Sequence, residues 1–235
     1  MLLKKTVFIL FILLLTTVSA LWAGDSAIFV DLGFSPDGRT YMFGQYGVLS
    51  PSLRPWADIY VVDVASNTFV QNGRASLIDN IPIKAGQDGS GTLHRLVSNN
   101  STLTNRYNIK FQNQGLPLYI SRDKYPPMRG ERIDFRSDFL SGEKYTAQII
   151  STITGSGQNI RSSFYIQMEK ISTNGQIKRT YTVGTPGFIR QKIASYNFKR
   201  VLIDATESTI IFVIEMKRVA DNGYDIRYMV EALRL

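Results

Sequence analysis

The chain has 235 residues and no cysteine, which excludes disulfides, zinc–thiolate sites, iron–sulfur clusters and a thiol nucleophile. Apolar residues make up 44% and charged residues 20%, values typical of a globular protein rather than a disordered one. The formal charge of +8 favours acidic partners such as an anionic envelope surface, although an ordinary basic, soluble surface explains it equally well.

The first 23 residues have the order of a secretory signal. Met1–Lys5 is basic, Val7–Leu15 is an unbroken apolar run, and Thr16–Ala23 is small and polar. A membrane anchor would need roughly 20 mostly apolar residues, and this run is shorter. We therefore expect residues 1–23 to be a signal peptide cleaved after Ala23, or else after Ala20, and the mature protein to be periplasmic or secreted without a transmembrane segment.

The first part of the mature chain reads as consecutive strands. Ile28–Phe34 and Thr40–Tyr46 flank Ser35–Gly38 (Ser-Pro-Asp-Gly), whose proline, aspartate and glycine suit a tight turn. This pattern predicts a β-hairpin. A third strand is expected over Ala57–Val64, and Phe69-Val70 begins a fourth.

The middle of the chain has weaker patterns. Thr92–Val97 reads as one short helix with Ser90 as its cap. Strands are expected over Tyr107–Phe111 and Pro117–Ser121. Arg122–Arg132 contains two consecutive prolines and is expected to be an exposed connection.

Strand patterns then continue to the C-terminus, separated by turns rich in Gly, Asn and Ser. Tyr and Phe are abundant along the chain, and such side chains suit the pleated surface of a sheet. The sequence therefore predicts an all-β, mostly antiparallel fold. The expected strands here are Tyr145–Thr154, Ile160–Ile171, Gln176–Val183, Ala194–Ile203, Thr209–Lys217 and Asp225–Leu233.

The two ends of the mature chain share a pattern of turn, loop and Asp-Ile strand. Phe34 precedes Ser-Pro-Asp-Gly-Arg and Ile203 precedes Asp-Ala-Thr-Glu-Ser, and a phenylalanine follows nine residues after each. Blade-like repeats near residues 28–70 and 198–235 predict a β-propeller within a single all-β domain over 24–235. A β-sandwich or a barrel-like meander is the alternative, in which the two ends are ordinary hairpins with similar turns.

These segments also carry a family resemblance. Phe34-Ser-Pro-Asp-Gly-Arg with Asp58-Ile-Tyr-Val-Val-Asp-Val resembles the propeller repeat of TolB-type periplasmic proteins, which implies a fold and no function. Most of the mature chain is similar to a family of predicted secreted bacterial proteins of unknown function, frequent among spirochaetes. The similar stretches are Leu32–Tyr46, Asp58–Val64, Tyr181–Pro186 and Asp225–Leu235. The resemblance transfers no active site.

The sequence indicates no reaction centre, cofactor or metal site. His94 is the sole histidine, and no Gly-x-Ser-x-Gly motif or phosphate-binding Gly-Lys-Ser/Thr motif is present. We therefore expect no catalytic residues. A carboxylate pair formed by folding stays possible, with candidates at Asp58, Asp63, Asp134, Asp138, Asp204, Glu207 and Glu215.

Two loops hold the candidates for binding. Tyr125 and Arg129 lie in the basic segment Arg122–Arg132, and arginine and tyrosine are enriched at interfaces. Trp56 follows Arg54-Pro55 and is a similar candidate, although an aromatic residue at the start of a strand commonly packs in a core. No nucleic-acid-binding module is recognisable.

These observations favour an exported, non-catalytic envelope protein that acts as a binding or scaffolding module for another envelope protein or a polymer. The alternative is an envelope hydrolase for glycan or peptide that uses a carboxylate pair. A small-ligand carrier with a barrel cavity is a third hypothesis.

Overall fold

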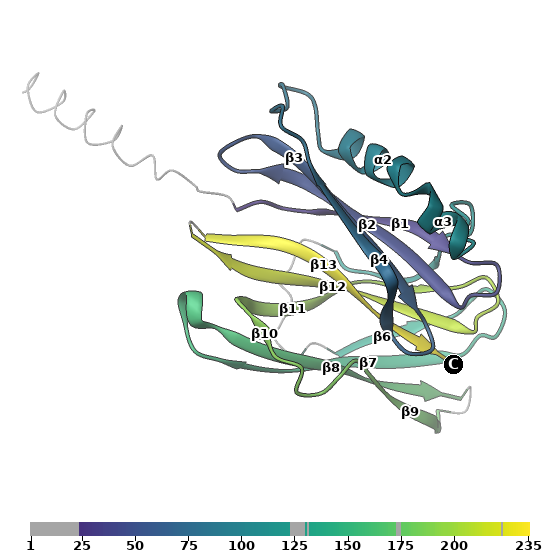
Figure 1. The fold of residues 1–235 in the computed structure, drawn as a ribbon. Coiled ribbons are helices and arrows are strands. Elements are labelled where there is room, and N and C mark those ends of the chain that lie inside the picture. The colour runs from purple at the N-terminus through teal and green to yellow at the C-terminus, as the bar shows by residue number, and fades with distance from the viewer. Residues whose placement is uncertain (1–23, 123–129, 131, 173–174, 222) are drawn as a thin grey trace, which may run out of the picture.

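The computed structural model describes residues 24–122, 130, 132–172, 175–221 and 223–235, which form three antiparallel sheets and two short helices (Figure 1). The predicted leader and the candidates Tyr125 and Arg129 lie outside these residues. Within them, neither helix has the length and apolar character needed to cross a bilayer. The predicted all-β, antiparallel class is confirmed.

The N-terminal sheet is a meander of four strands in the order β1-β2-β3-β4. These strands are β1 (Ile28–Phe34), β2 (Thr40–Leu49), β3 (Arg54–Asp63) and β4 (Thr68–Ile78). The turn predicted between the first two strands closes where the Ser35 N–H donates to the Thr40 carbonyl at 3.0 Å. The four predicted strands are all present.

The middle strands of this sheet, β2 and β3, are buried on both faces, which explains their long apolar runs. In β3, Ile59 and Val61 face the helices α2 (Ser90–Asn99) and α3 (Ser101–Arg106). Val62 faces the opposite way, into a second core. A strand of this kind alternates between two apolar surroundings, so polar residues need not alternate along it.

The central sheet has the order β13-β12-β11-β5. It consists of β5 (Leu116–Ile120), β11 (Ile193–Ile203), β12 (Thr209–Ala220) and β13 (Gly223–Arg234). The outer sheet has the order β10-β8-β7-β6, and β9 also pairs with β8. Its strands are β6 (Arg132–Arg136), β7 (Lys144–Thr154), β8 (Arg161–Ile171), β9 (Ile177–Val183) and β10 (Arg190–Gln191), with a 3-10 turn at Gly157–Asn159 between β7 and β8.

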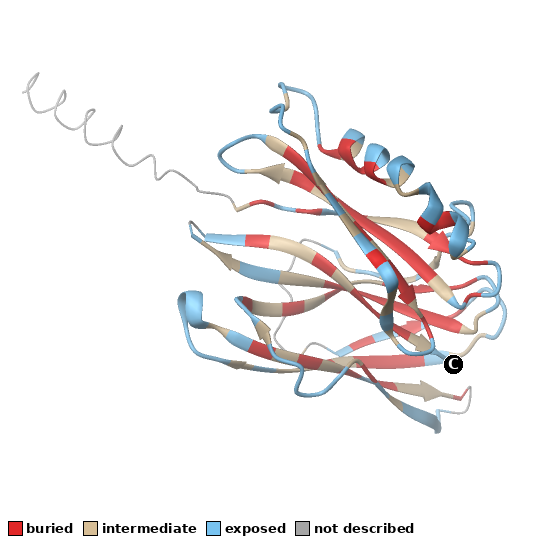
Figure 2. Cartoon of the chain, in the orientation of Figure 1, coloured by how far each residue is buried: buried red, intermediate tan, exposed pale blue. Residues whose placement is uncertain are grey.

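The sheets stack as layers, with the central sheet between the other two (Figure 1). Successive residues of β12 serve different cores: Phe212 packs toward the outer sheet and Val213 toward the N-terminal sheet. Figure 2 shows the buried residues concentrated between the layers and beneath the helices. Stacked sheets are the arrangement of the sandwich alternative, and the propeller-like blades are not confirmed.

The two turns of the predicted repeat nevertheless have the same local structure. Gly38 N–H donates to the Ser35 carbonyl at 3.0 Å, and Glu207 N–H donates to the Asp204 carbonyl at 2.9 Å. Gly38 and Glu207 both have positive φ, +65° and +53°. The turns also meet, because the Thr209 hydroxyl donates to the Gly38 carbonyl at 3.3 Å.

Two expectations for the middle of the chain are wrong. Tyr107–Phe111 is not a strand: Tyr107 N–H donates to Leu103 and Ile109 N–H to Thr104, which ends the helix and turns the chain under the N-terminal sheet. The helix predicted over Thr92–Val97 is longer, and its N-cap is Gly89 rather than Ser90.

Candidate functional site

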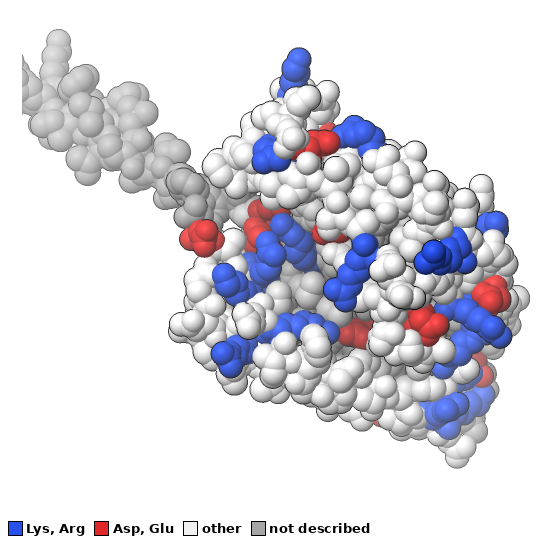
Figure 3. Space-filling model, in the orientation of Figure 1, with Lys and Arg blue, Asp and Glu red and all other residues white. Residues whose placement is uncertain are grey.

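A cleft of about 760 Å³ runs along β13, where the edges of the three sheets come together. We call it the edge cleft. β13 and β12 line its centre, the N-terminal sheet lines one side, and residues 185–193 line the other. Figure 3 shows this face hollowed, with basic side chains around the hollow. The charged residues of the described lining are Asp58, Arg74, Arg190, Arg218, Arg227 and Glu231.

One side of the edge cleft depends on a segment that leaves the outer sheet. β9 pairs with residues 166–171 of β8 and β10 with residues 161–162, so the chain between them departs from the edge of β8. Gly184 and Gly187 have positive φ, +91° and +80°, which favours glycine there. This segment brings Thr185 and the exposed ring of Phe188 to the cleft.

Glu231 is a buried carboxylate of β13 at the end of the edge cleft nearest Arg190. Its Oε2 accepts a hydrogen bond from Asn67 Nδ2 at 2.5 Å, and its Oε1 lies 3.5 Å from Arg190 Nη2. Burial raises the pKa of Glu231 above its ordinary value, although the Asn67 hydrogen bond and the Arg190 charge partly oppose this. Asn67 also accepts the Ala232 N–H at 2.7 Å, so it fixes β13 and Glu231 together.

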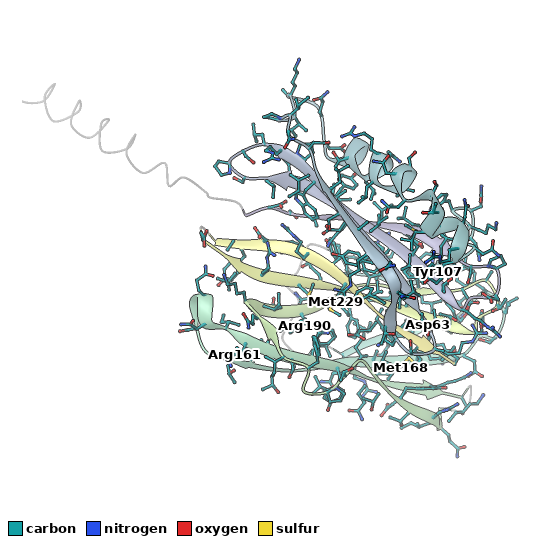
Figure 4. All side chains as sticks on the ribbon, viewed as in Figure 1. Asp63, Tyr107, Arg161, Met168, Arg190 and Met229 are labelled. Carbon is teal, nitrogen blue, oxygen red and sulfur yellow. The ribbon has the colours of Figure 1, made fainter. Side chains whose placement is uncertain are left out.

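Arg190 connects the outer sheet to Glu231. Its guanidinium lies 4.7 Å from the Phe164 ring centroid and 4.8 Å from that of Phe188, a cation–π arrangement. In Figure 4, Arg190 on β10 and Met229 on β13 lie on neighbouring layers beside the gap between them. An arginine held by two rings and a carboxylate has a fixed orientation.

The middle of the edge cleft holds a second carboxylate, Asp58 on β3. Its Oδ2 accepts hydrogen bonds from Gln45 Nε2 at 3.3 Å and from the Tyr60 hydroxyl at 3.2 Å. Burial and the Asp58 charge raise the pKa of Tyr60 to about 12. Gln45 Oε1 in turn accepts the Tyr228 N–H at 2.9 Å, so side chains of the N-terminal sheet occupy the outward N–H groups of β13 here.

The far end of the edge cleft is closed by a buried ion-pair network. Arg227 Nη2 donates to Asp25 Oδ2 at 2.7 Å and lies 3.7 Å from Asp225 Oδ2. Asp25 also accepts the Trp56 indole N–H at 2.6 Å, and the Arg227 guanidinium lies over the Trp56 ring at 4.3 Å. Arg218 pairs with Asp225 at 2.7 Å on the solvent side.

The structure places the predicted binding residues as follows. Trp56 is 5% exposed and belongs to the core between the N-terminal and central sheets, so its ring packs against protein. Tyr125 and Arg129 lie outside the described residues. None of the three contributes to the described lining of the edge cleft.

Of the predicted carboxylate candidates, Asp58 alone lines the edge cleft in the described chain. Two of the others hold backbone elsewhere: Asp204 accepts N–H groups of its own turn, and Glu207 accepts the Leu140 and Ser141 N–H groups of a distant loop. His94 is exposed on α2. Among the described residues, no three acidic, histidine or cysteine side chains come together as a metal site requires. The remaining candidates outside the lining are Asp63, Asp134, Asp138 and Glu215.

Sequence reasoning missed Gln45, Asn67, Arg190 and Glu231, because residues from distant parts of the chain form the edge cleft. One signal was available. Asp225, Arg227 and Glu231 occupy one face of a largely apolar strand, and charges inside such a strand need partners in the fold.

Comparison with known proteins gives a family. The family model described as "Predicted secreted protein (DUF2259)" matches residues 42–234. The chain belongs to this family. The DUF2259 match extends from β2 to β13 and therefore covers the strands that line the edge cleft. It confirms the resemblance to predicted secreted proteins of unknown function, while the spirochaete and TolB-type resemblances stay expectations. No curated protein matches the chain, and no solved structure does.

Proposed function

We propose that this DUF2259 protein is an exported, non-catalytic binding protein of the cell envelope, and that its ligand occupies the edge cleft. The observation that carries the proposal is the cleft itself, whose volume of about 760 Å³ falls within the roughly 300–1,000 Å³ of ligand sites. The ligand would be part of another envelope protein or of a polymer. Its place of action is the periplasm or the medium.

The lining suits recognition. Aromatic surfaces of Tyr60, Phe69 and Phe188 lie beside charged groups, a combination that provides contact area and fixed polar partners. The two carboxylates are held by neighbouring side chains, Asp58 by Gln45 and Tyr60 and Glu231 by Asn67 and Arg190. Such prior bonding favours a fixed binding surface over groups that exchange protons.

The test is a matched pair of variants of the full chain. Thr185→Trp places a large ring at the mouth of the edge cleft, on an exposed residue. Thr182→Trp makes the same change on an exposed residue of β9 outside the described lining. Immobilised protein is incubated with fractionated envelope glycans, peptides and proteins, and the retained components are identified.

We expect the wild type and Thr182→Trp to retain the same component and Thr185→Trp to lose it. Equal retention by all three proteins would show that the edge cleft is not the binding site. If none of the three proteins retains any component, the binding function itself is contradicted.

A hydrolase is the second candidate, because Asp58 and Glu231 both line the edge cleft and Glu231 has the raised pKa expected of a general acid. Incubation of the full chain with envelope glycans and peptides tests it. Products released by the wild type and lost in both Glu231→Gln and Asp58→Asn would establish catalysis and overturn the binding proposal.

A further inference from the structure

The chemistry of the edge cleft restricts what it binds; this inference rests on the function proposed above. Its described lining has four arginines against two acids. Arg74 and Arg218 are its exposed cations; Arg218 already pairs with Asp225 at 2.7 Å on its inner side, whereas Arg74 makes no ion pair with any described residue. The Arg74 guanidinium lies 3.8 Å from the Phe69 ring centroid, which holds it on the surface of the N-terminal sheet. The net positive lining favours a ligand with negative charge.

The same lining disfavours a ligand that carries negative charge alone. Asp58 and Glu231 are hydrogen-bond acceptors, and each would repel a second anion placed against it. Both hydrogen bonds that Asp58 accepts from Gln45 and Tyr60 go to Oδ2, so Oδ1 can accept one from a ligand. The ligand must therefore bring hydrogen-bond donors as well as anionic groups.

The edge cleft also has aromatic surfaces for flat, partly apolar rings. Tyr60 and Phe69 are partly exposed on the N-terminal sheet, with their ring centroids 5.4 Å apart, and Tyr60 stacks at 4.8 Å on Phe43, which is buried beneath it. Phe188, 57% exposed, lies on the opposite side. The C–H faces of sugar rings pack on such side chains while their hydroxyl groups reach polar neighbours.

An extended peptide fits this site less well. A peptide binds a sheet edge by pairing with its outward N–H and C=O groups. The outward N–H groups of Ile226, Tyr228 and Ala232 on β13 already donate to Asp25, Gln45 and Asn67. Strand addition along β13 would have to break these bonds.

From these observations we propose that the edge cleft binds an acidic oligosaccharide, a hydroxyl-rich chain whose carboxylate groups pair with Arg74 and Arg218. The sugar rings pack against the aromatic side chains of the two walls. Asp58 and Glu231 accept hydrogen bonds from its hydroxyl groups.

Calorimetric titration of the full chain with a short oligogalacturonate tests the proposal. The matched ligand is the same oligomer with its carboxyl groups methyl-esterified, which keeps the rings and removes the charge. Oligoglutamate serves as an acidic peptide. The matched proteins are Arg74→Ala/Arg218→Ala and Arg106→Ala, the latter an exposed arginine at the end of α3 outside the described lining.

We expect binding of the oligogalacturonate that weakens with added salt, and loss of affinity on esterification. Two exposed ion pairs together account for roughly a tenfold change in affinity, so the double variant should lose about that factor and Arg106→Ala nothing. Equal affinity for the esterified oligomer would overturn the role of charge. Preference for oligoglutamate would overturn the assignment to a saccharide.

Failure of this proposal is distinguishable from failure of the proposed function. If no saccharide binds, the acidic-saccharide assignment is wrong, while the comparison of Thr185→Trp with Thr182→Trp still decides whether the edge cleft binds envelope material. If the oligogalacturonate binds Thr185→Trp as tightly as the wild type, its site lies outside the edge cleft and the inference is wrong.

Discussion

Replacing Asp25 by alanine should destabilise the fold more than removal of any exposed acid. The Asp25 side chain is 5% exposed and accepts hydrogen bonds from Arg227 at 2.7 Å and from the Trp56 indole at 2.6 Å. The variant leaves the indole N–H unpaired in the core and leaves Arg227 with Asp225 alone, 3.7 Å away. Its main-chain bonds to β13 do not require the carboxylate.

Breaking a buried ion pair by removing one partner costs about 3–5 kcal/mol. Because Asp225 still faces Arg227, and because burial raises the pKa of Asp25 and so opposes its ionisation, we expect the low end, about 3 kcal/mol. Urea unfolding at neutral pH, followed by circular dichroism, measures the free energy of unfolding. Circular dichroism is preferable to tryptophan fluorescence, because the mutation changes the surroundings of Trp56 directly.

Two further variants serve as controls for the Asp25→Ala prediction. Asp138→Ala removes an exposed partner of Arg136, both more than half exposed, and should change stability by no more than about 1 kcal/mol. Adding Arg227→Met to Asp25→Ala should recover part of the loss, because no uncompensated charge remains buried. A loss below about 1 kcal/mol for Asp25→Ala would refute this reasoning about the network.

Three further predictions, one of them with a matched control variant, test other parts of the fold. Glu231→Gln should gain stability relative to the wild type as pH rises from 4 upward. The folded pKa of Glu231 lies above its ordinary 4.5, so protonated Glu231 contributes stability to the wild type below pH 4.5, and this contribution is lost as pH rises through the folded pKa. Urea unfolding at a series of pH values checks this. Gly33→Ala should cost more than about 2 kcal/mol, since φ is +102° and a Cβ would lie 2.3 Å from the Lys110 carbonyl oxygen, whereas Gly86→Ala, with φ of +84° and no atom within 4 Å, should cost about 1 kcal/mol in thermal or urea unfolding. Asp204→Ala should cost about 1–3 kcal/mol, since its buried carboxylate accepts two backbone N–H groups of its turn, and a variant as stable as the wild type would contradict that role.

Strand positions were predictable from the sequence because local patterns determine them. The hairpin around Ser35–Gly38 and the strands that became β7, β8, β9, β11, β12 and β13 follow from apolar runs bounded by turn residues. The short strands β6 and β10 were missed. Both are short, and their own composition does not indicate a strand. β6 is a strand because it pairs with β7, and β10 because it pairs with β8.

The layering and the edge cleft were not predictable in the same way. Two similar turns indicated blades, but local turn chemistry does not determine how sheets pack. Here β5 pairs with β11 although all the strands of the outer sheet lie between them in the sequence. The cleft unites Asn67, Arg190 and Glu231, which are far apart in the chain. Trp56 was a binding candidate because it follows Arg54-Pro55, but it has the core position that the sequence analysis gave as the common role of such a residue, with its indole N–H bonded to Asp25.

Methyl NMR of methionine-labelled full chain tests the central claim, that ligand binds in the edge cleft, most directly. Met216 and Met229 line the cleft, whereas Met42 and Met168 are fully buried in other parts of the cores. On addition of the envelope component that the protein retains, we predict shifts of the Met216 and Met229 methyl signals, with those of Met42 and Met168 unchanged. Saturating binding that leaves the Met216 and Met229 signals in place would contradict the claim.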